Sequence, residues 1–180
     1  MHTWGRLAQR LRVPVGTALG VVFLLLMHPS WRSLWLGGAI AVAGASLRLW
    51  AAGHIDKGRS LTQGGPYALT RNPLYLGSFL MALGILLAGQ GYWLLIPFGL
   101  FFAAFYYPVM RAEERELLAG YGDAFLRYSR RVPLFLPRPG FSPEGSSSFL
   151  WSRVIKNREH RTLLGFLLAA AILCTMMIAG

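Results

Sequence analysis

Two small groups of polar side chains stand at the edges of long apolar runs and could carry chemistry. Arg71, Asn72 and Tyr75 lie where one run begins, and Glu113 and Glu114 lie about one turn beyond the end of the next. A guanidinium can bind a carboxylate through a forked pair of hydrogen bonds, and carboxylates can accept from an ammonium or a hydroxyl. The sequence offers no plausible Ser-His-Asp or Cys-His set for nucleophilic catalysis.

Each of these residues also has a purely structural explanation. Asn is a favoured N-cap and Pro a favoured first helical residue, so Asn72-Pro73 can simply begin a helix. Arg71 and Tyr75 are typical of membrane interfaces. The acidic pair can form ion pairs with neighbouring arginines. Carboxylates are nevertheless unexpected at an anionic membrane surface, which repels them.

Composition places the chain in a membrane. Of its 180 residues, 54% are hydrophobic and 14% are charged, and the mean hydropathy is +0.45. Soluble domains carry about 25% charged residues, so these values argue against a soluble globule and exclude a disordered chain. A net charge of +11 fits nucleic acid or an anionic membrane surface, and the apolar runs decide for the membrane. The single cysteine, Cys174, excludes an internal disulfide and a zinc site of several thiolates, and we expect no metal.

Five apolar stretches approach the roughly 20 residues that a membrane-spanning helix needs. They predict an all-α, polytopic membrane helical bundle with about five transmembrane helices and a cytoplasmic helical segment after the fourth. The first stretch is short, but no small-residue cleavage site follows it, so we interpret it as a retained helix and not a secretory signal. The expected spans are 13–28, 34–53, 73–89, 91–110 and about 162–180, and the expected cytoplasmic helix is 111–131.

Glycines are spaced for close packing of these helices. Gly16 and Gly20 are four residues apart, and Gly37, Gly38 and Gly44 recur along the second span. Small residues allow helix backbones to approach closely in a membrane, so we expect these glycines to pack helices together.

The basic residues predict the orientation of the chain. With five spans, all of the 18 lysines and arginines except Arg32 fall on one side of the membrane. Cytoplasmic loops carry an excess of Lys and Arg, so we expect the N-terminus and the site to be cytoplasmic and the C-terminus to lie on the opposite side. The lipid bilayer, and not nucleic acid, is the expected partner of this basic surface.

The third and fourth spans are joined by a minimal connection near Gln90, so we expect them to be antiparallel neighbours. That hairpin would bring Arg71 and the acidic pair to one membrane depth, in a pocket open to cytosolic solutes and to lipid. A Pro/Gly/Ser-rich linker, 139–148, separates a membrane core, 1–138, from a C-terminal cytoplasmic segment and final membrane helix, 149–180. We expect the site to lie before this linker.

Two sequence blocks within residues 53–137 resemble the isoprenylcysteine carboxyl methyltransferase and phospholipid methyltransferase superfamily of integral membrane enzymes. The first resembles the family's G-P-Y followed by R-H-P-x-Y-x-G, and the second its E-E-x-x-L, aromatic-Gly, Tyr and V-P run. Asn72 departs from this pattern, since it replaces a histidine by a side chain that forms hydrogen bonds but does not titrate. The blocks read Gly65-Pro66-Tyr67 with Thr70-Arg71-Asn72-Pro73-Leu74-Tyr75-Leu76-Gly77, and Glu113-Glu114 with Leu117-Leu118, Tyr121-Gly122, Tyr128 and Val132-Pro133.

The resemblance implies S-adenosylmethionine as methyl donor, bound at the cytoplasmic membrane face of a helical fold. The catalytic residues that we expect are Arg71, Glu113 and Glu114. We further include His54, which lies on the same side and would assist. The residues expected to bind the donor are His54, Gly65, Pro66, Tyr67, Arg71, Asn72, Pro73, Tyr75, Glu113, Glu114 and Tyr128.

The methyl acceptor is expected to be lipid-like or a small apolar molecule. Candidates are the carboxylate of a prenylated cysteine, a phospholipid amine or another apolar metabolite. Two other functions stay open from the sequence: an NADPH-dependent membrane reductase of sterol-reductase-like architecture, and a non-catalytic membrane scaffold whose motifs only cap helices.

Overall fold

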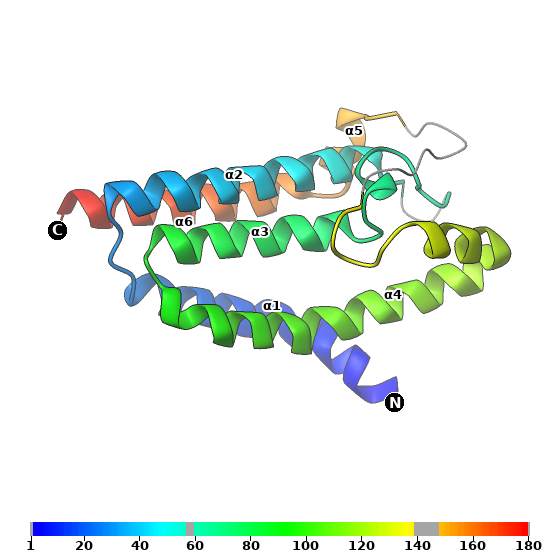
Figure 1. The fold of residues 1–180 in the computed structure, drawn as a ribbon, viewed down its shortest axis with the longest axis horizontal. Helices are drawn as coiled ribbons and strands as arrows, with labels where there is room; N and C mark the ends of the chain where they lie inside the picture. Colours follow the sequence, from blue (N-terminus) through cyan, green and yellow to red (C-terminus); the bar gives the residue numbers. More distant parts are fainter. Residues whose placement is uncertain (1, 57–59, 139–147, 180) are drawn as a thin grey trace.

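The fold is helical in the part of the chain that the structure describes, which confirms the all-α prediction. The structure is a computed structural model that describes residues 2–56, 60–138 and 148–179 (Figure 1). Residues 139–147 of the expected linker lie outside the described residues. The α-helices are α1 (His2–Leu25), α2 (Trp31–His54), α3 (Pro73–Ala88), α4 (Leu95–Arg131), α5 (Trp151–Lys156) and α6 (Glu159–Ala179), and the 3-10 helices are η1 (Gly65–Ala68) and η2 (Tyr92–Leu94).

The long helices form two groups. In Figure 1, α2 and α3 run side by side with α6 behind them, and α1 and α4 cross below. The C-terminus lies at one end of the molecule, and η1, the start of α3 and the end of α4 gather at the other end. The two blocks that resemble the methyltransferases therefore share one end of the bundle.

Helices α2 and α3 are in closest contact because small residues line both surfaces. A Cβ on Gly37 would lie 2.3 Å from the backbone nitrogen of Ala88, and a Cβ on Gly44 would lie 2.6 Å from that of Met81. The two backbones thus touch at two levels along the helices. This arrangement confirms the packing role expected for Gly37 and Gly44.

The other glycines of the expected packing series have more space. A Cβ on Gly16 would make an ordinary contact with the Phe101 ring at 3.4 Å, and Gly20 and Gly38 have nothing within 4 Å of that position. The expectation of close helix packing is therefore wrong for Gly20 and Gly38, because these two glycines face open space and not a neighbouring backbone.

The third and fourth spans are antiparallel, as expected, but they are not each other's main partner. Helix α3 packs chiefly on α2, and few backbone contacts join α3 to α4. Aromatic side chains fill the space between α3 and α4. Phe79 stacks on Phe98 with ring centroids 5.2 Å apart and meets Phe102 edge-on at 5.0 Å. The bulk of these rings holds α4 away from α3.

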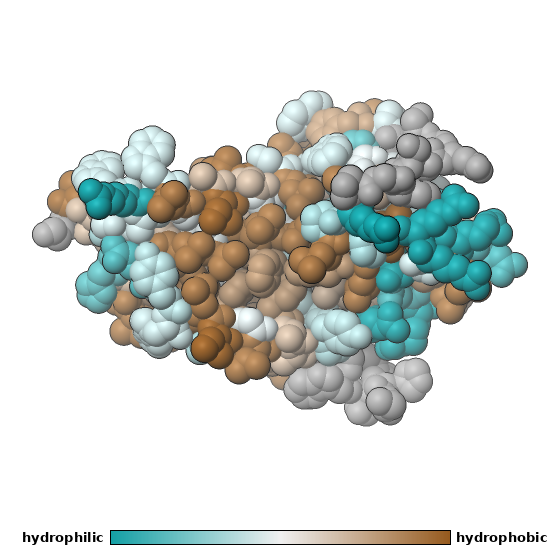
Figure 2. Space-filling view, viewed as in Figure 1, coloured by the Kyte–Doolittle hydropathy of each residue, from teal (hydrophilic) through white to brown (hydrophobic). Residues whose placement is uncertain are grey.

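Three helices within the described residues are long and apolar enough to cross a membrane: Trp31–His54, the 40 residues Tyr92–Arg131, and Glu159–Ile178. Two apolar helical segments, Val13–Leu25 and Pro73–Ala88, are shorter than the usual span. Figure 2 shows hydrophobic side chains over the middle of the visible face and hydrophilic ones towards its two ends. The structure supports a polytopic membrane bundle, and the number of five spans stays a prediction.

The expected cytoplasmic helix, 111–131, is the continuation of the fourth span, because α4 runs for 37 residues without ending at the membrane surface. Gly122 interrupts its helical geometry with φ 49° and ψ −125°, a conformation that glycine tolerates. Beyond this kink, Phe125, Tyr128 and Val132 form a buried cluster. The kink turns the chain back towards the start of α3.

The close approach of α2 and α3 predicts opposite effects for two adjacent substitutions. Gly37→Ala would press a methyl group into the α3 backbone, and we expect it to lower the free energy of unfolding by about 1–3 kcal/mol. Gly38→Ala meets nothing within 4 Å and should be neutral or slightly stabilising, since alanine is a better helix former. Thermal unfolding of the two detergent-purified variants checks this, and equal melting temperatures would contradict it.

Candidate functional site

The start of α3 and the segment after α4 lie side by side. The backbone N–H of Arg71 donates to the carbonyl of Pro133 at 2.9 Å, and the N–H of Arg138 donates to the carbonyl of Leu69, also at 2.9 Å. These hydrogen bonds join the two sequence blocks that are some sixty residues apart in the chain. The polar residues of both blocks are thereby brought to one place.

Asn72 stands directly before α3, as expected, but its side chain does not cap the helix. Its amide Nδ2 donates instead to the carbonyl of Leu134 at 3.0 Å. The hydroxyl of Thr70 donates to the same carbonyl at 3.3 Å and accepts from the backbone N–H of Asn72 at 3.3 Å. The Asn72 side chain therefore binds the segment that follows α4 and holds it against the start of α3.

Arg71 and Glu114 form a buried ion pair across the two blocks. Arg71 Nη1 lies 2.7 Å from Glu114 Oε1, and the two side chains are only 14% and 10% exposed. Glu114 Oε2 also accepts a hydrogen bond from Arg111, whose side chain is half exposed. One carboxylate therefore faces two guanidinium groups, and the cluster has a positive charge in excess. The Nε of Arg71 is buried and has no hydrogen-bond partner among the described residues, so it can still donate to an oxygen.

Glu113 is held by a tyrosine from the facing helix. The hydroxyl of Tyr75 donates to Glu113 Oε1 at 2.6 Å. The Tyr75 ring also meets Tyr106 edge-on, with centroids 5.7 Å apart. The second carboxylate of the acidic pair is thus oriented by α3 and has acceptor capacity left for a ligand.

Tyr67 adds an unused donor. Its side chain is 7% exposed, and its hydroxyl is buried without a hydrogen-bond partner among the described residues. Burial, with a smaller effect of nearby Tyr128 and Glu113, raises the pKa of Tyr67 well above its ordinary value, so the hydroxyl keeps its proton. The backbone carbonyl of Tyr67 accepts from the Tyr128 hydroxyl at 2.7 Å, which fixes η1 against α4.

These groups surround a pocket of about 720 Å³. Its walls come from the end of α2, the start of α3, the second half of α4 and the first turns of α6. Acidic, basic and aromatic groups face the same space. Eight of the sequence-predicted residues line it: Tyr67, Arg71, Asn72, Pro73, Tyr75, Glu113, Glu114 and Tyr128.

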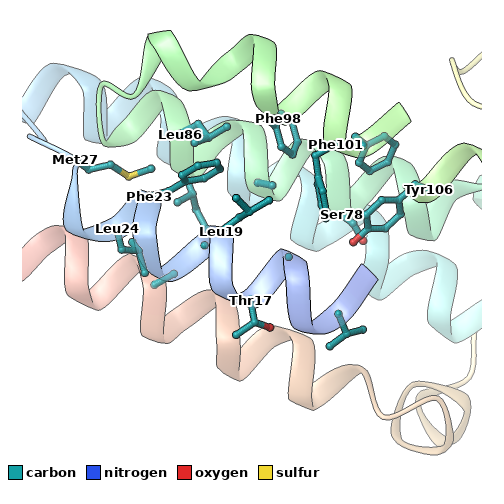
Figure 3. Close-up of a pocket in the computed structure, with 17 residues that line it drawn as sticks. Thr17, Leu19, Phe23, Leu24, Met27, Ser78, Leu86, Phe98, Phe101 and Tyr106 are labelled. Carbon is teal, nitrogen blue, oxygen red and sulfur yellow. The ribbon is translucent and has the colours of Figure 1, made fainter. Parts of the chain in front are cut away.

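A second, apolar cavity of about 380 Å³ adjoins this pocket. It lies between α1, α3 and α4, and Figure 3 shows Phe23, Leu86 and Phe98 around it. Ser78 and Tyr106 line both spaces and stand at one end of the apolar cavity in Figure 3. A polar compartment and an apolar one therefore meet at a shared boundary.

Comparison with known proteins identifies the family. The phospholipid methyltransferase family matches residues 15–124, which include the first block and the acidic pair. The chain belongs to this family. No solved structure matches the chain.

Three curated relatives are similar to the chain, and one of them is named a methyltransferase. The cobalt-zinc-cadmium resistance protein CzcN of Cupriavidus metallidurans is 35% identical over 124 residues, 64% of this chain and 57% of that protein. The nickel-cobalt-cadmium resistance protein NccN of Alcaligenes xylosoxydans xylosoxydans is 32% identical over 136 residues, 71% of this chain and 62% of that protein. The protein-S-isoprenylcysteine O-methyltransferase of Schizosaccharomyces pombe is 30% identical over 99 residues, 55% of this chain and 42% of that protein. The matches thus cover less than two thirds of each relative's length. Membership of the family favours methyl transfer over the two other functions that the sequence left open, the reductase and the scaffold.

Three residues proposed from the sequence support the pocket from outside and are not among the residues that line it. The His54 ring forms a hydrogen bond with the carbonyl of Trp50 at 2.9 Å and meets Phe149 edge-on at 5.9 Å. Gly65 has φ +59°, and a Cβ there would lie 2.5 Å from the His54 ring. Pro66 is buried, and its carbonyl accepts from the N–H groups that close η1. The sequence analysis predicted that these three residues bind the donor, because the contact between His54 and η1 is visible only in the tertiary structure.

The sequence analysis missed several residues that line the polar pocket. Arg48 was counted only as a positive charge of the inner side, although a charged residue within an apolar run is itself a signal of function. Ser78 and Tyr106 stood inside apolar runs without any motif. Thr162 follows the linker, so the pocket is not confined to residues before 139–148.

The hydrogen bond from Asn72 predicts a stability defect that is specific to this buried amide. Asn72→Asp would replace the Nδ2 donor by a carboxylate facing the Leu134 carbonyl, and we expect the free energy of unfolding to fall by about 1–3 kcal/mol. Gln90→Glu makes the same chemical change at an exposed position and should have little effect. Chemical or thermal unfolding measures both, and an equal effect of the two changes would contradict the positioning role of Asn72.

Proposed function

We propose that the chain is a membrane methyltransferase that uses S-adenosylmethionine and methylates a lipid-like or small apolar acceptor. The observation that carries this proposal is the meeting of the two family blocks around one polar pocket that adjoins an apolar cavity. A charged, water-soluble donor and an apolar acceptor require such a pair of compartments, because neither compartment alone would solvate both reactants.

The residues present fit the donor. S-adenosylmethionine has a carboxylate, an ammonium, ribose hydroxyls and a cationic sulfur. The free Nε of Arg71 and the free hydroxyl of Tyr67 are donors for oxygen atoms, and Glu113 is an acceptor for the ammonium or the ribose. The aromatic walls suit the adenine ring and the sulfonium, the latter by cation–π attraction. The pocket volume lies within the roughly 300–1,000 Å³ that is usual for small-molecule sites.

Each polar side chain of the pocket has a separate task in this proposal. Arg71 binds the donor carboxylate with the part of its guanidinium that Glu114 leaves free. Glu114 keeps Arg71 in place, because a buried guanidinium without a partner would be strongly destabilised. Glu113 accepts from the donor, and Tyr75 holds its carboxylate in position. Tyr128 holds η1 and forms part of the wall.

Methyl transfer depends on the alignment of donor and acceptor and on the exclusion of water, and it needs no nucleophilic side chain of the enzyme. The donor supplies a methyl group bonded to a positively charged sulfur, which the acceptor displaces in line. The chain holds the two reactants at about 3–3.5 Å and closes the site to water. Asn72 and backbone hydrogen bonds attach residues 133–138 to the start of α3, beside the pocket.

The apolar cavity accommodates the body of the acceptor, with its reactive end at the boundary formed by Ser78 and Tyr106. A carboxylate acceptor could react without a base, whereas an ammonium acceptor would first lose a proton. We further propose that the site faces the cytoplasm, where the basic residues place it.

Donor binding tests the proposed site. We expect Arg71→Ala, Glu113→Ala and Glu114→Ala to weaken the binding of labelled S-adenosylmethionine to the detergent-purified chain by at least about tenfold, since each removes a charge-assisted contact. Arg115→Ala, at the exposed position next to the acidic pair, should bind like the wild type. Unchanged affinity in all three site variants would remove the proposed site, and binding of NADPH in place of the donor would favour the reductase.

Filling the apolar cavity should separate acceptor binding from donor binding. Gly20 lines the cavity, and a Cβ there would have nothing within 4 Å, so Gly20→Leu adds volume to the cavity. Gly99→Leu adds the same side chain on the exposed side of α4. With labelled donor and a total lipid extract, we expect Gly20→Leu to lower labelling of the acceptor several-fold at unchanged donor affinity, and Gly99→Leu to have no effect. Equal labelling by both variants would show that the acceptor binds elsewhere.

A further inference from the structure

The guanidinium of Arg48 uses all of its hydrogen-bonding capacity at the boundary of the two compartments. Its Nε and Nη2 donate to the two carboxylate oxygens of Glu159 at 2.5 and 3.0 Å, and Nη2 also donates to Thr162 at 3.4 Å. Its Nη1 donates to the carbonyl of Leu74 at 3.0 Å and to the Ser78 hydroxyl. These five hydrogen bonds match the five N–H donors of an arginine, so one side chain joins α2, α3 and α6.

The fold makes room for this cluster. Gly77 lies against the stem of Arg48, since a Cβ at Gly77 would stand 2.5 Å from Arg48 Cγ. Glu159 is 3% exposed, at the first turn of α6, where the helix dipole favours a negative charge. A buried carboxylate is strongly destabilised without a partner, so Glu159 and Arg48 depend on one another.

The C-terminal segment is attached to the end of α2 by further contacts that do not involve Glu159, among them ion pairs of Arg153 and Lys156 with Asp56 at 3.6 and 3.7 Å. The backbone N–H of Leu150 donates to the carbonyl of Gly53 at 2.9 Å. The amide Nδ2 of Asn157 donates to the carbonyl of Ala52 at 3.0 Å. Several contacts other than the pair of Arg48 and Glu159 therefore attach this segment.

Arg48 lines the polar pocket, and Glu159 lies beyond the residues that match the family. We propose that Glu159 is a positioning and charge-neutralising residue of the methyl-transfer site: it holds Arg48 at the pocket wall and cancels its positive charge where a cationic sulfonium is to bind. The inference rests on the proposed function. In this proposal, α6 contributes a side chain that the site needs.

The charge of the bound sulfur makes this role measurable. S-adenosylmethionine has a sulfonium, whereas the product S-adenosylhomocysteine has a neutral thioether in an otherwise closely similar molecule. A Glu159→Gln variant leaves the positive charge of Arg48 without its partner, so we expect donor binding to weaken about tenfold more than product binding. This factor is the repulsion between two unit charges, the guanidinium and the sulfonium, about 10 Å apart in a protein-like dielectric. Arg48→Gln removes the positive charge and keeps the Glu159 carboxylate, so it should increase the preference for the donor over the product.

The experiment measures the affinities of both ligands for the full detergent-purified chain. Asn157→Ala is the matched control, because it loosens the same attachment of the C-terminal segment without changing charge. It should alter both affinities by the same factor.

The double variant Arg48→Gln with Glu159→Gln removes both charges, so its ratio of donor affinity to product affinity should return to that of the wild type. This double variant replaces Glu159→Gln in the test if the single variant does not fold.

The outcomes separate the two proposals. Opposite shifts of the donor-to-product preference in the two single variants, or restoration in the double variant, support the charge role of Glu159. If both ligands bind the wild type and every variant changes the two affinities equally, the cluster is only structural and the inference is overturned while the methyltransferase proposal stands. If the wild type binds neither ligand, the proposed function itself is overturned, and this inference with it.

Discussion

The ion pair between Arg71 and Glu114 is the contact on which the polar pocket depends, since it joins the start of α3 to the middle of α4 inside the protein. A buried guanidinium needs a carboxylate, and two helices that each contribute one of the pair are held together at that depth. Arg48 and Glu159 repeat this arrangement between α2 and α6. Two buried arginines, each with its own carboxylate, thus set the positions of four helices around one space.

Helix packing decides where these charged pairs stand. The glycines of α2 and α3 bring the two backbones into contact, and Gly77 leaves room for the stem of Arg48. The aromatic rings between α3 and α4 act in the opposite sense and hold those helices apart. The result is an open space between α3 and α4. Its polar end lies among the charges, and its apolar end lies among the rings and α1.

Much of the fold and part of the site could be predicted because they depend on local patterns. The apolar runs predicted the helices, and the positions of Arg71 and Glu114 beside two of those runs predicted that they would share one end of the bundle. The side chain of Asn72 could not be predicted, because its partner, the Leu134 carbonyl, is reached only after the kink at Gly122.

By itself, the sequence determined a helical membrane protein of the methyltransferase family, because hydropathy and motifs are properties of contiguous residues. It also predicted which residues would bind a charged donor, and this stays a prediction. Only the tertiary structure decided which partners these residues have. His54 faces Gly65 and not the pocket, and Arg48 meets Glu159 across more than one hundred residues of chain. Such pairings depend on the distances between helices, which small and aromatic residues set jointly, so no single segment of the sequence contains them.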